Sequence, residues 1–150
     1  PFFDNPTTRG LFDASTRTYW AVDSFGANVP HPAEDAAEMD HAAWREGVLL
    51  VNRLNHPWHQ WLDEAKFGDY LRQVQSLGIE VLPSCHGPTI YGPMVDDAFQ
   101  LLSEVPSMPQ WEEPGQSDLE AMLAAAGAMA AAPGAGTAAV PPQAGPRDEG

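Results

Sequence analysis

The spacing of apolar and polar residues predicts a hairpin and two helices in the first half of the chain. Aromatic and β-branched residues flank a short polar turn, which is typical of two strands, 11–12 and 18–22, joined as a β-hairpin. Residues 24–32 are rich in glycine and proline and predict a loop. Apolar residues then recur every three or four positions, which predicts amphipathic helices over 33–54 and 58–77.

A strand and a further helix follow. Gly78 is placed to end the second helix as a left-handed cap. The apolar run 79–82 predicts a short buried strand, and apolar positions within 94–102 predict a third amphipathic helix. Strands that alternate with helices indicate an α/β fold built of layers.

The pattern of large apolar residues ends near residue 104. Residues 105–150 are dominated by Ala, Gly and Pro, which predicts a flexible, low-complexity acidic tail with a transient helix over 118–132. We therefore expect residues 1–104 to form the folded domain.

Composition excludes several classes of partner. The net charge of −14 disfavours binding to nucleic acid or to an anionic membrane, because both require a surplus of Lys and Arg on one face. The longest apolar run, 121–132, is shorter than the ~20 residues that span a bilayer. A single cysteine rules out an internal disulfide framework and is typical of a reducing compartment. We expect a soluble, cytoplasmic protein.

Two stretches of the sequence contain candidate site residues. Asp23 follows the predicted strand 18–22, and His86 follows the predicted strand 79–82 in a loop with Gly87 and Pro88. The carboxyl ends of strands are where metal and substrate sites lie in layered α/β folds. Cys85, beside His86, is expected to be a small buried residue rather than a metal ligand or nucleophile, since no obvious activating base is evident for it.

These stretches, their separation and the opening PTTRGLF resemble the metallo-β-lactamase superfamily, and most closely its flavodiiron, or oxygen-binding diiron, branch. In that branch one strand ends in D-x-F-G, whose Asp bridges two metal ions, and a later strand ends in S-H-G-P, whose His binds one of them. Asp23 and His86 match these positions. The resemblance covers about residues 1–104 and implies half of a metallo-β-lactamase αββα sandwich.

The resemblance also implies a larger protein. The remaining metal ligands of the family form a His-rich cluster in the first half of the fold, and no such cluster occurs in this chain. We therefore expect the chain to be the C-terminal half of a longer protein and to be inactive by itself. No flavin site is visible, and the flavodoxin domain that many flavodiiron proteins carry is not recognisable.

Three functions follow from the resemblance. The first is a diiron oxidoreductase that reduces dioxygen or nitric oxide, with electrons from a separate flavin or rubredoxin-type partner. The second is a dizinc hydrolase acting on a small-molecule substrate, and the third is a non-catalytic metal-binding or sensor module. Iron is favoured over zinc, although one Asp and one His suit either ion. A homodimer is left open.

Four other residues are considered as pocket lining. The family places a histidine soon after D-x-F-G, and His31 either replaces it or lies on the loop surface. His56 and His59 could bring two imidazoles onto one helical face, but packing is favoured over metal binding because no further ligand follows at the required spacing. Thr8, with Thr7, either lies near the active edge or satisfies local backbone groups.

Overall fold

The computed structural model describes residues 8–131, which divide into two compact units. The first unit ends at Trp111 and the second begins at Glu112. The sequence placed this boundary after residue 104, but Val105 and Pro106 are buried and extend the first unit. The predicted tail beyond residue 131 lies outside the described residues.

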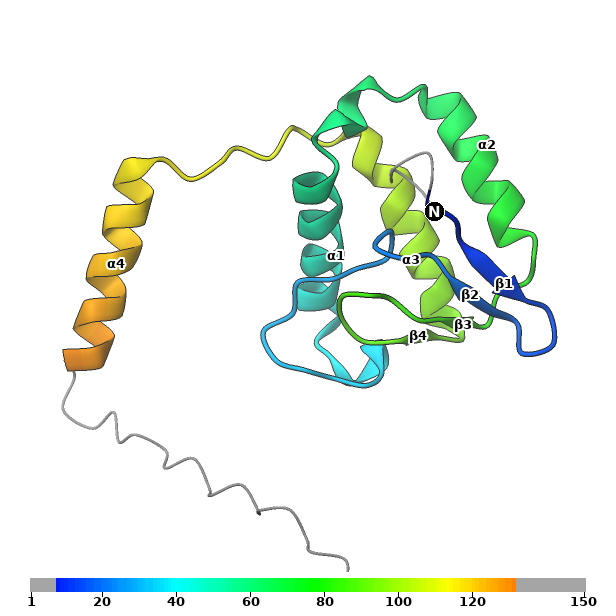
Figure 1. Ribbon diagram of the computed structural model, residues 1–150, viewed down its shortest axis with the longest axis horizontal. Coiled ribbons are helices and arrows are strands. Elements are labelled where there is room, and N and C mark those ends of the chain that lie inside the picture. The colour runs from blue at the N-terminus through cyan, green and yellow to red at the C-terminus, as the bar shows by residue number, and fades with distance from the viewer. Residues whose placement is uncertain (1–7, 132–150) are drawn as a thin grey trace, which may run out of the picture. The chain divides into compact units, whose positions relative to one another are not determined.

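The first unit contains a small mixed sheet (Figure 1). Its strands are β1 (Leu11–Asp13), β2 (Thr18–Trp20), β3 (Val81–Leu82) and β4 (Ile90–Tyr91), hydrogen-bonded in that order. β1 pairs with β2 and β3 with β4 in antiparallel fashion, whereas the central strands β2 and β3 are parallel. The predicted hairpin and the strand at 79–82 are confirmed, and β4 was not predicted.

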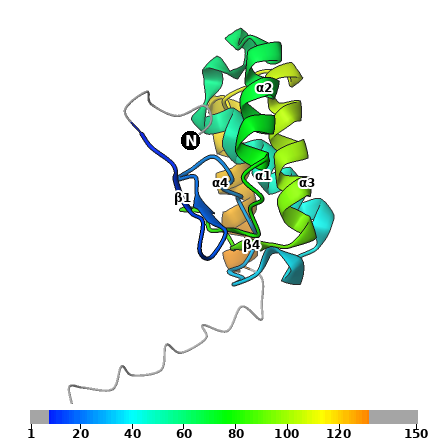
Figure 2. The same ribbon diagram turned by 90° about the vertical axis from the view of Figure 1, so that its right-hand side faces the viewer.

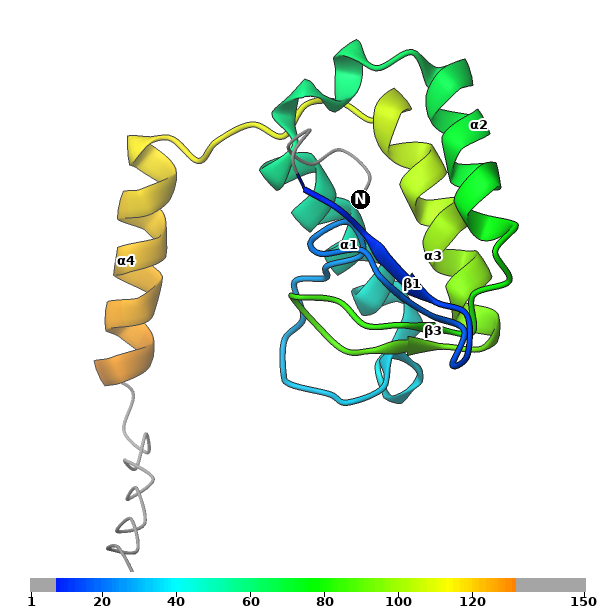
Figure 3. The same ribbon diagram turned by 45° about the vertical axis from the view of Figure 1, so that its right-hand side comes forward.

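Helices cover one face of this sheet, as Figure 2 shows. They are α1 (His41–Asn55), α2 (Glu64–Gln75) and α3 (Pro93–Glu104), with short 3₁₀ helices at Ala36–Glu38, Pro57–Trp61 and Val105–Ser107. α3 contacts both α1 and α2 and also β4 (Figure 3). The first unit is therefore mixed α/β, and the predicted third helix is confirmed.

The predicted helices over 33–54 and 58–77 are wrong in extent, because each is interrupted near its start. The Asp40 side chain accepts a hydrogen bond from the amide of Ala43 at 2.9 Å and so begins α1, and Asp63 does the same for Lys66 at 3.1 Å in α2. Short carboxylates satisfy the otherwise unpaired first amides of a helix. Gly78, after α2, has the expected left-handed conformation with φ of 71°.

The core lies between the sheet and the helices. Side chains alternate between the two faces of a strand, so Tyr19, Leu82 and Ile90 are buried against the helices, whereas Trp20 and Tyr91 are exposed. The largest fully buried side chains include Trp44 of α1 and Phe25, together with Leu101 and Leu102 of α3. Phe25 lies two residues after the predicted site residue Asp23, so the core anchors the loop that carries Asp23.

In its described part, residues 112–131, the second unit contains one helix, α4 (Gln116–Ala131). Its sequence is rich in alanine, which has the highest helix propensity. The Asp118 side chain accepts a hydrogen bond from the amide of Gly115 at 2.8 Å and so supports the start of the helix. The transient helix expected near 118–132 corresponds to α4. Within residues 8–131, no helix is long and apolar enough to cross a membrane.

Candidate functional site

Two loops, one after β2 and one after β3, meet at one edge of the sheet. Because β2 and β3 are parallel neighbours, their carboxyl ends lie side by side. The loops are joined by two backbone hydrogen bonds, from Cys85 to the carbonyl of Val22 at 3.1 Å and from Ala27 to the carbonyl of His86 at 2.8 Å. The backbone therefore fixes the position of one loop relative to the other.

These loops bring Asp23 and His86 together. The Nε2 atom of His86 lies 3.2 Å from Oδ1 of Asp23, so the two side chains are in direct contact. The His86 side chain is 61% exposed and that of Asp23 is 35% exposed, which leaves the pair open to solvent. In its own loop, the hydroxyl of Ser84 accepts a hydrogen bond from the His86 amide at 3.2 Å.

The separation of the two atoms fits a shared metal ion as well as a direct ion pair. Ligand atoms at about 2.1 Å from one ion lie about 3 Å apart when the angle between the bonds is about 90–110°. A carboxylate oxygen and an imidazole nitrogen suit both iron and zinc. Within residues 8–131, however, no group of three or more His, Cys, Asp or Glu side chains could hold a metal ion. The pair therefore offers two groups of the kind that bind metal ions, and no third such group of the described residues joins them.

A second His–Asp pair on the first unit gives a useful comparison. Nε2 of His41, at the start of α1, lies 3.4 Å from Oδ2 of Asp97 in α3, and the His41 side chain is also 61% exposed. This pair joins the surfaces of two helices. The pair of Asp23 and His86 differs because both residues lie in loops at the strand ends and His86 lines a cavity.

The backbone at Val22 is strained next to the site. Val22 has φ of 59°, in the left-handed region that a β-branched residue rarely adopts. Such a conformation costs about 1–3 kcal/mol and is typical of functional sites. It directs the chain from Ala21 into the turn that carries Asp23, and the Val22 carbonyl accepts the hydrogen bond from Cys85. Sequence reasoning missed this residue, because valine gives no signal of a positive φ.

Replacing Val22 should reveal the strain. Val22→Gly and Val22→Ala remove the same methyl groups, but only glycine adopts a positive φ without steric cost. We expect the glycine variant to be more stable than the alanine variant by about 1 kcal/mol, the reverse of the usual order. Urea unfolding followed by circular dichroism measures this difference. A more stable alanine variant would show that the turn is unstrained.

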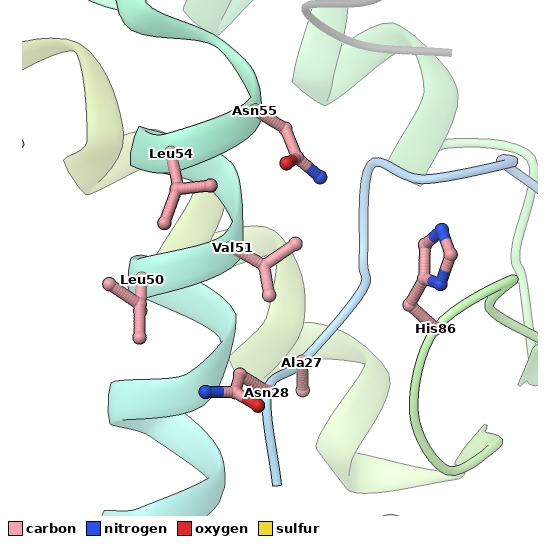
Figure 4. A pocket seen from close by; sticks show the side chains of 7 residues that line it. All are labelled: Ala27, Asn28, Leu50, Val51, Leu54, Asn55 and His86. Carbon is pink, nitrogen blue, oxygen red and sulfur yellow. The ribbon is translucent and has the colours of Figure 1, made fainter. Parts of the chain in front are cut away.

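A cavity lies between α1 and the two loops (Figure 4). Its volume is ≈ 420 Å³, within the usual range for small-ligand sites. Figure 4 shows the Val51 side chain and the Asn55 amide directed from α1 toward the gap, with His86 on the opposite side. The residues that line it are Ala27, Asn28, Leu50, Val51, Leu54, Asn55 and His86. Of these, only His86 was predicted as a site residue, because the lining comes from three separate segments.

The other predicted pocket residues lie elsewhere, and none of them lines the cavity beside His86. His31 is exposed and Thr8 is half-buried. His56 and His59 are buried, and Nδ1 of His56 lies 3.0 Å from the carbonyl of Asn52. The prediction that Cys85 is buried is wrong, because its side chain is exposed.

His59 is a buried titratable group away from the site. Burial, reinforced by the charge of Arg53, lowers the pKa of His59 below its ordinary value of 6.5, and the carbonyls of Val105 and Pro106 oppose this only in part. Within the described residues neither ring nitrogen has a hydrogen-bond partner of ordinary geometry. The packed form of His59 is therefore the neutral one.

This predicts a pH-dependent stability. The unfolded chain binds a proton at His59 more readily than the folded chain, so stability should be complete above about pH 6.5 and should fall as the pH drops toward the lowered folded value. His59→Leu removes two unpaired polar atoms, so we expect it to raise the free energy of unfolding by about 1 kcal/mol near neutral pH and by more in acid. Urea unfolding at about pH 7.5 and about pH 5.5 tests this.

The exposed His31→Leu variant is the control, and its stability should change by less than about 0.5 kcal/mol. Equal pH dependence in His59→Leu and the wild type would contradict the assignment to His59.

Comparison with known proteins places the chain in no family. No protein-family model, curated protein or solved structure matches it. The function must therefore be argued from the geometry of the site and from the sequence motifs.

Proposed function

We propose that Asp23 and His86 are ligands of a metal centre whose remaining ligands lie outside this chain. The observation that supports this most directly is the distance of 3.2 Å between an imidazole nitrogen and a carboxylate oxygen at adjacent strand ends. The backbone hydrogen bonds between the two loops support it further, since ligands held in place need little reordering when an ion binds. The half sandwich of the metallo-β-lactamase type remains part of this proposal.

The favoured activity is that of a diiron oxidoreductase that reduces dioxygen or nitric oxide, and its support is the match to the diiron branch at both motifs. When bound, two metal ions would supply redox chemistry or, with zinc, an activated water for hydrolysis. The chain itself would orient one ion through the His86 imidazole and share the Asp23 carboxylate between two. The adjoining cavity of ≈ 420 Å³ would admit a small molecule beside His86.

A non-catalytic metal-binding or sensor module is the alternative besides the dizinc hydrolase. One observation favours it: within residues 8–131 only two potential ligands converge, fewer than the three protein ligands of typical catalytic zinc sites. In that case Asp23 and His86 contact each other directly, and their proximity does not require a metal ion between them.

Elemental analysis with absorption spectroscopy tests the proposal. The protein encoded by the full reading frame would be purified without added metal and compared with Asp23→Ala. About two irons per chain, lost in the variant, would support the diiron oxidoreductase, whereas about two zinc ions would favour the hydrolase. Protein without stoichiometric metal would leave only the non-catalytic function.

A further inference from the structure

The buried His59 lies where two short 3₁₀ helices meet. It belongs to the helix Pro57–Trp61, called here the His59 helix, which contacts the helix Val105–Ser107, called here the terminal helix. Both helices also contact α1. The His59 side chain is fully buried, and within residues 8–131 neither ring nitrogen has a hydrogen-bond partner of ordinary geometry. Charge on such a ring is costly, because burial removes water and no partner replaces it.

A charged His59 ring would face one cation and no carboxylate among the residues that the structure describes. The His59 helix has no other ionisable side chain, and the terminal helix has none. α1 contributes Arg53, whose positive charge opposes protonation of the ring, and the backbone carbonyls of the terminal helix offset burial and this charge only in part. His56, the other buried histidine, lies just before the His59 helix, with its Nδ1 atom beside a backbone carbonyl of α1. Protonation of His59 is therefore unfavourable while the terminal helix is in place.

Exposed side chains tie the chain that follows the terminal helix to the first unit. They donate hydrogen bonds to three successive carbonyls: Gln60 to Met108 at 3.2 Å, and Arg53 to Pro109 at 3.0 Å and to Gln110 at 3.4 Å. The first unit ends at Trp111, so residues 105–111 are its last segment. The His59 helix, in contrast, is fixed at both ends, between α1 and α2. The last segment can therefore detach while the sheet and the longer helices stay folded.

We propose that His59 is a pH-sensitive latch for the last segment of the first unit, residues 105–111. At neutral pH the uncharged ring packs against the terminal helix and holds it in place. In acid the ring takes up a proton beside Arg53, and the terminal helix detaches so that water reaches the charged ring. The inference goes beyond the proposed metal centre, because neither Asp23 nor His86 takes part. It also goes beyond the acid response of the whole unit, because it names the segment that opens first.

Hydrogen exchange measured by NMR on the full 150-residue chain tests the latch. The Met108 amide, bonded to the Val105 carbonyl at 3.1 Å, reports on the terminal helix, and the amide of the fully buried Val48 in α1 reports on global unfolding. Each protection factor is taken relative to an unfolded peptide at the same pH. We expect the Met108 factor to be at least about tenfold lower than that of Val48, because detachment requires less than global unfolding.

Acid should lower the Met108 protection factor further. An opened His59 binds a proton with the ordinary pKa of 6.5, so a change from about pH 7.5 to about pH 5.5 should reduce the factor about three- to tenfold. A Met108 factor equal to that of Val48 would overturn the proposal, because the segment would then open only with the whole unit. A Met108 factor that does not change with pH would overturn it as well. Both comparisons use the wild-type chain and do not depend on the folding of a variant.

A pair of histidine variants assigns the pH response to one residue. His59→Leu cannot take up a proton, so its Met108 protection factor should be the same at both pH values to within about twofold. The exposed His31→Leu is the control and should keep the response of the wild type. A response that persists in His59→Leu would belong to another group, such as the neighbouring His56, and would contradict a latch at His59.

Discussion

Replacement of Gly47 by alanine is expected to destabilise the protein by about 3 kcal/mol. In an ordinary helix this change stabilises by up to about 1 kcal/mol, because alanine is the better helix former. Gly47 lies where α1 contacts the loop after β2, and its carbonyl accepts a hydrogen bond from the Asn28 amide at 3.2 Å. A Cβ atom at Gly47 would lie 2.1 Å from the carbonyl oxygen of Asn28.

The clash cannot be relieved by rotating a side chain, because the Cβ position is fixed by the α1 backbone and the atom that it meets is a backbone carbonyl oxygen. The loop would have to move, and with it Ala27, whose amide is hydrogen-bonded to the His86 carbonyl. We therefore expect the substitution to lower the unfolding midpoint in urea and also to change the NMR signals of the loop that carries His86.

Gly68→Ala in α2 is the matched control. The nearest atom to a Cβ there is the guanidinium nitrogen Nη1 of Arg72 at 3.3 Å, the end of a flexible and exposed side chain. This variant should gain about 0.5–1 kcal/mol from helix propensity. A lower free energy of unfolding in Gly47→Ala together with a higher one in Gly68→Ala would confirm the close approach at Gly47. A Gly47→Ala protein as stable as the wild type would refute it.

Removing either proposed metal ligand is expected to weaken binding of a divalent ion at the strand ends at least about tenfold. Asp23→Asn removes the charge while keeping the shape of the side chain, and His86→Gln removes the imidazole. Within residues 8–131 only two proposed ligands converge at this edge, so we expect weak binding of Co²⁺, with broadening of NMR signals centred on the two loops. The measurement therefore does not depend on enzymatic activity.

The pair of His41 and Asp97 provides the control for this experiment. Its atoms are separated by a similar distance, 3.4 Å, and its histidine is equally exposed. His41→Gln and Asp97→Asn should leave cobalt binding at the loops unchanged. Broadening that begins at His41 and Asp97 instead would mean that any surface His–Asp pair attracts the ion, and the strand-end site would then have no special affinity.

Local sequence placed the two candidate site residues, Asp23 and His86, just after strands, and the family resemblance singled them out. The strands 18–20 and 81–82 are short runs of β-forming or apolar residues, and each is followed by a turn. Parallel neighbouring strands end at the same edge of a sheet, so a residue just after each strand is brought close to the other. Asp23 and His86 each lie just after one of these two strands. Their contact therefore depends on the parallel pairing of β2 with β3.

Other features depended on contacts between distant segments. The cavity combines residues of α1 with two loops, and no periodic pattern in the chain relates them. The burial of His59 depends on the short 3₁₀ helix at Val105–Ser107, which contacts the 3₁₀ helix that carries His59. The sequence pattern had placed residues 105–107 outside the folded domain. The exposure of Cys85 depends on the direction of a loop, which apolar character does not predict.

The sequence by itself determined the α/β class, the hairpin, the third helix and the two strand ends that carry Asp23 and His86, because these depend on periodicity and turn residues within a few positions. Only the tertiary structure decided the left-handed Val22, the close approach at Gly47, the cavity beside His86 and the burial of His59. Each of these arises from packing between segments far apart in the chain, which selects backbone conformations and exposures that local preferences alone do not specify.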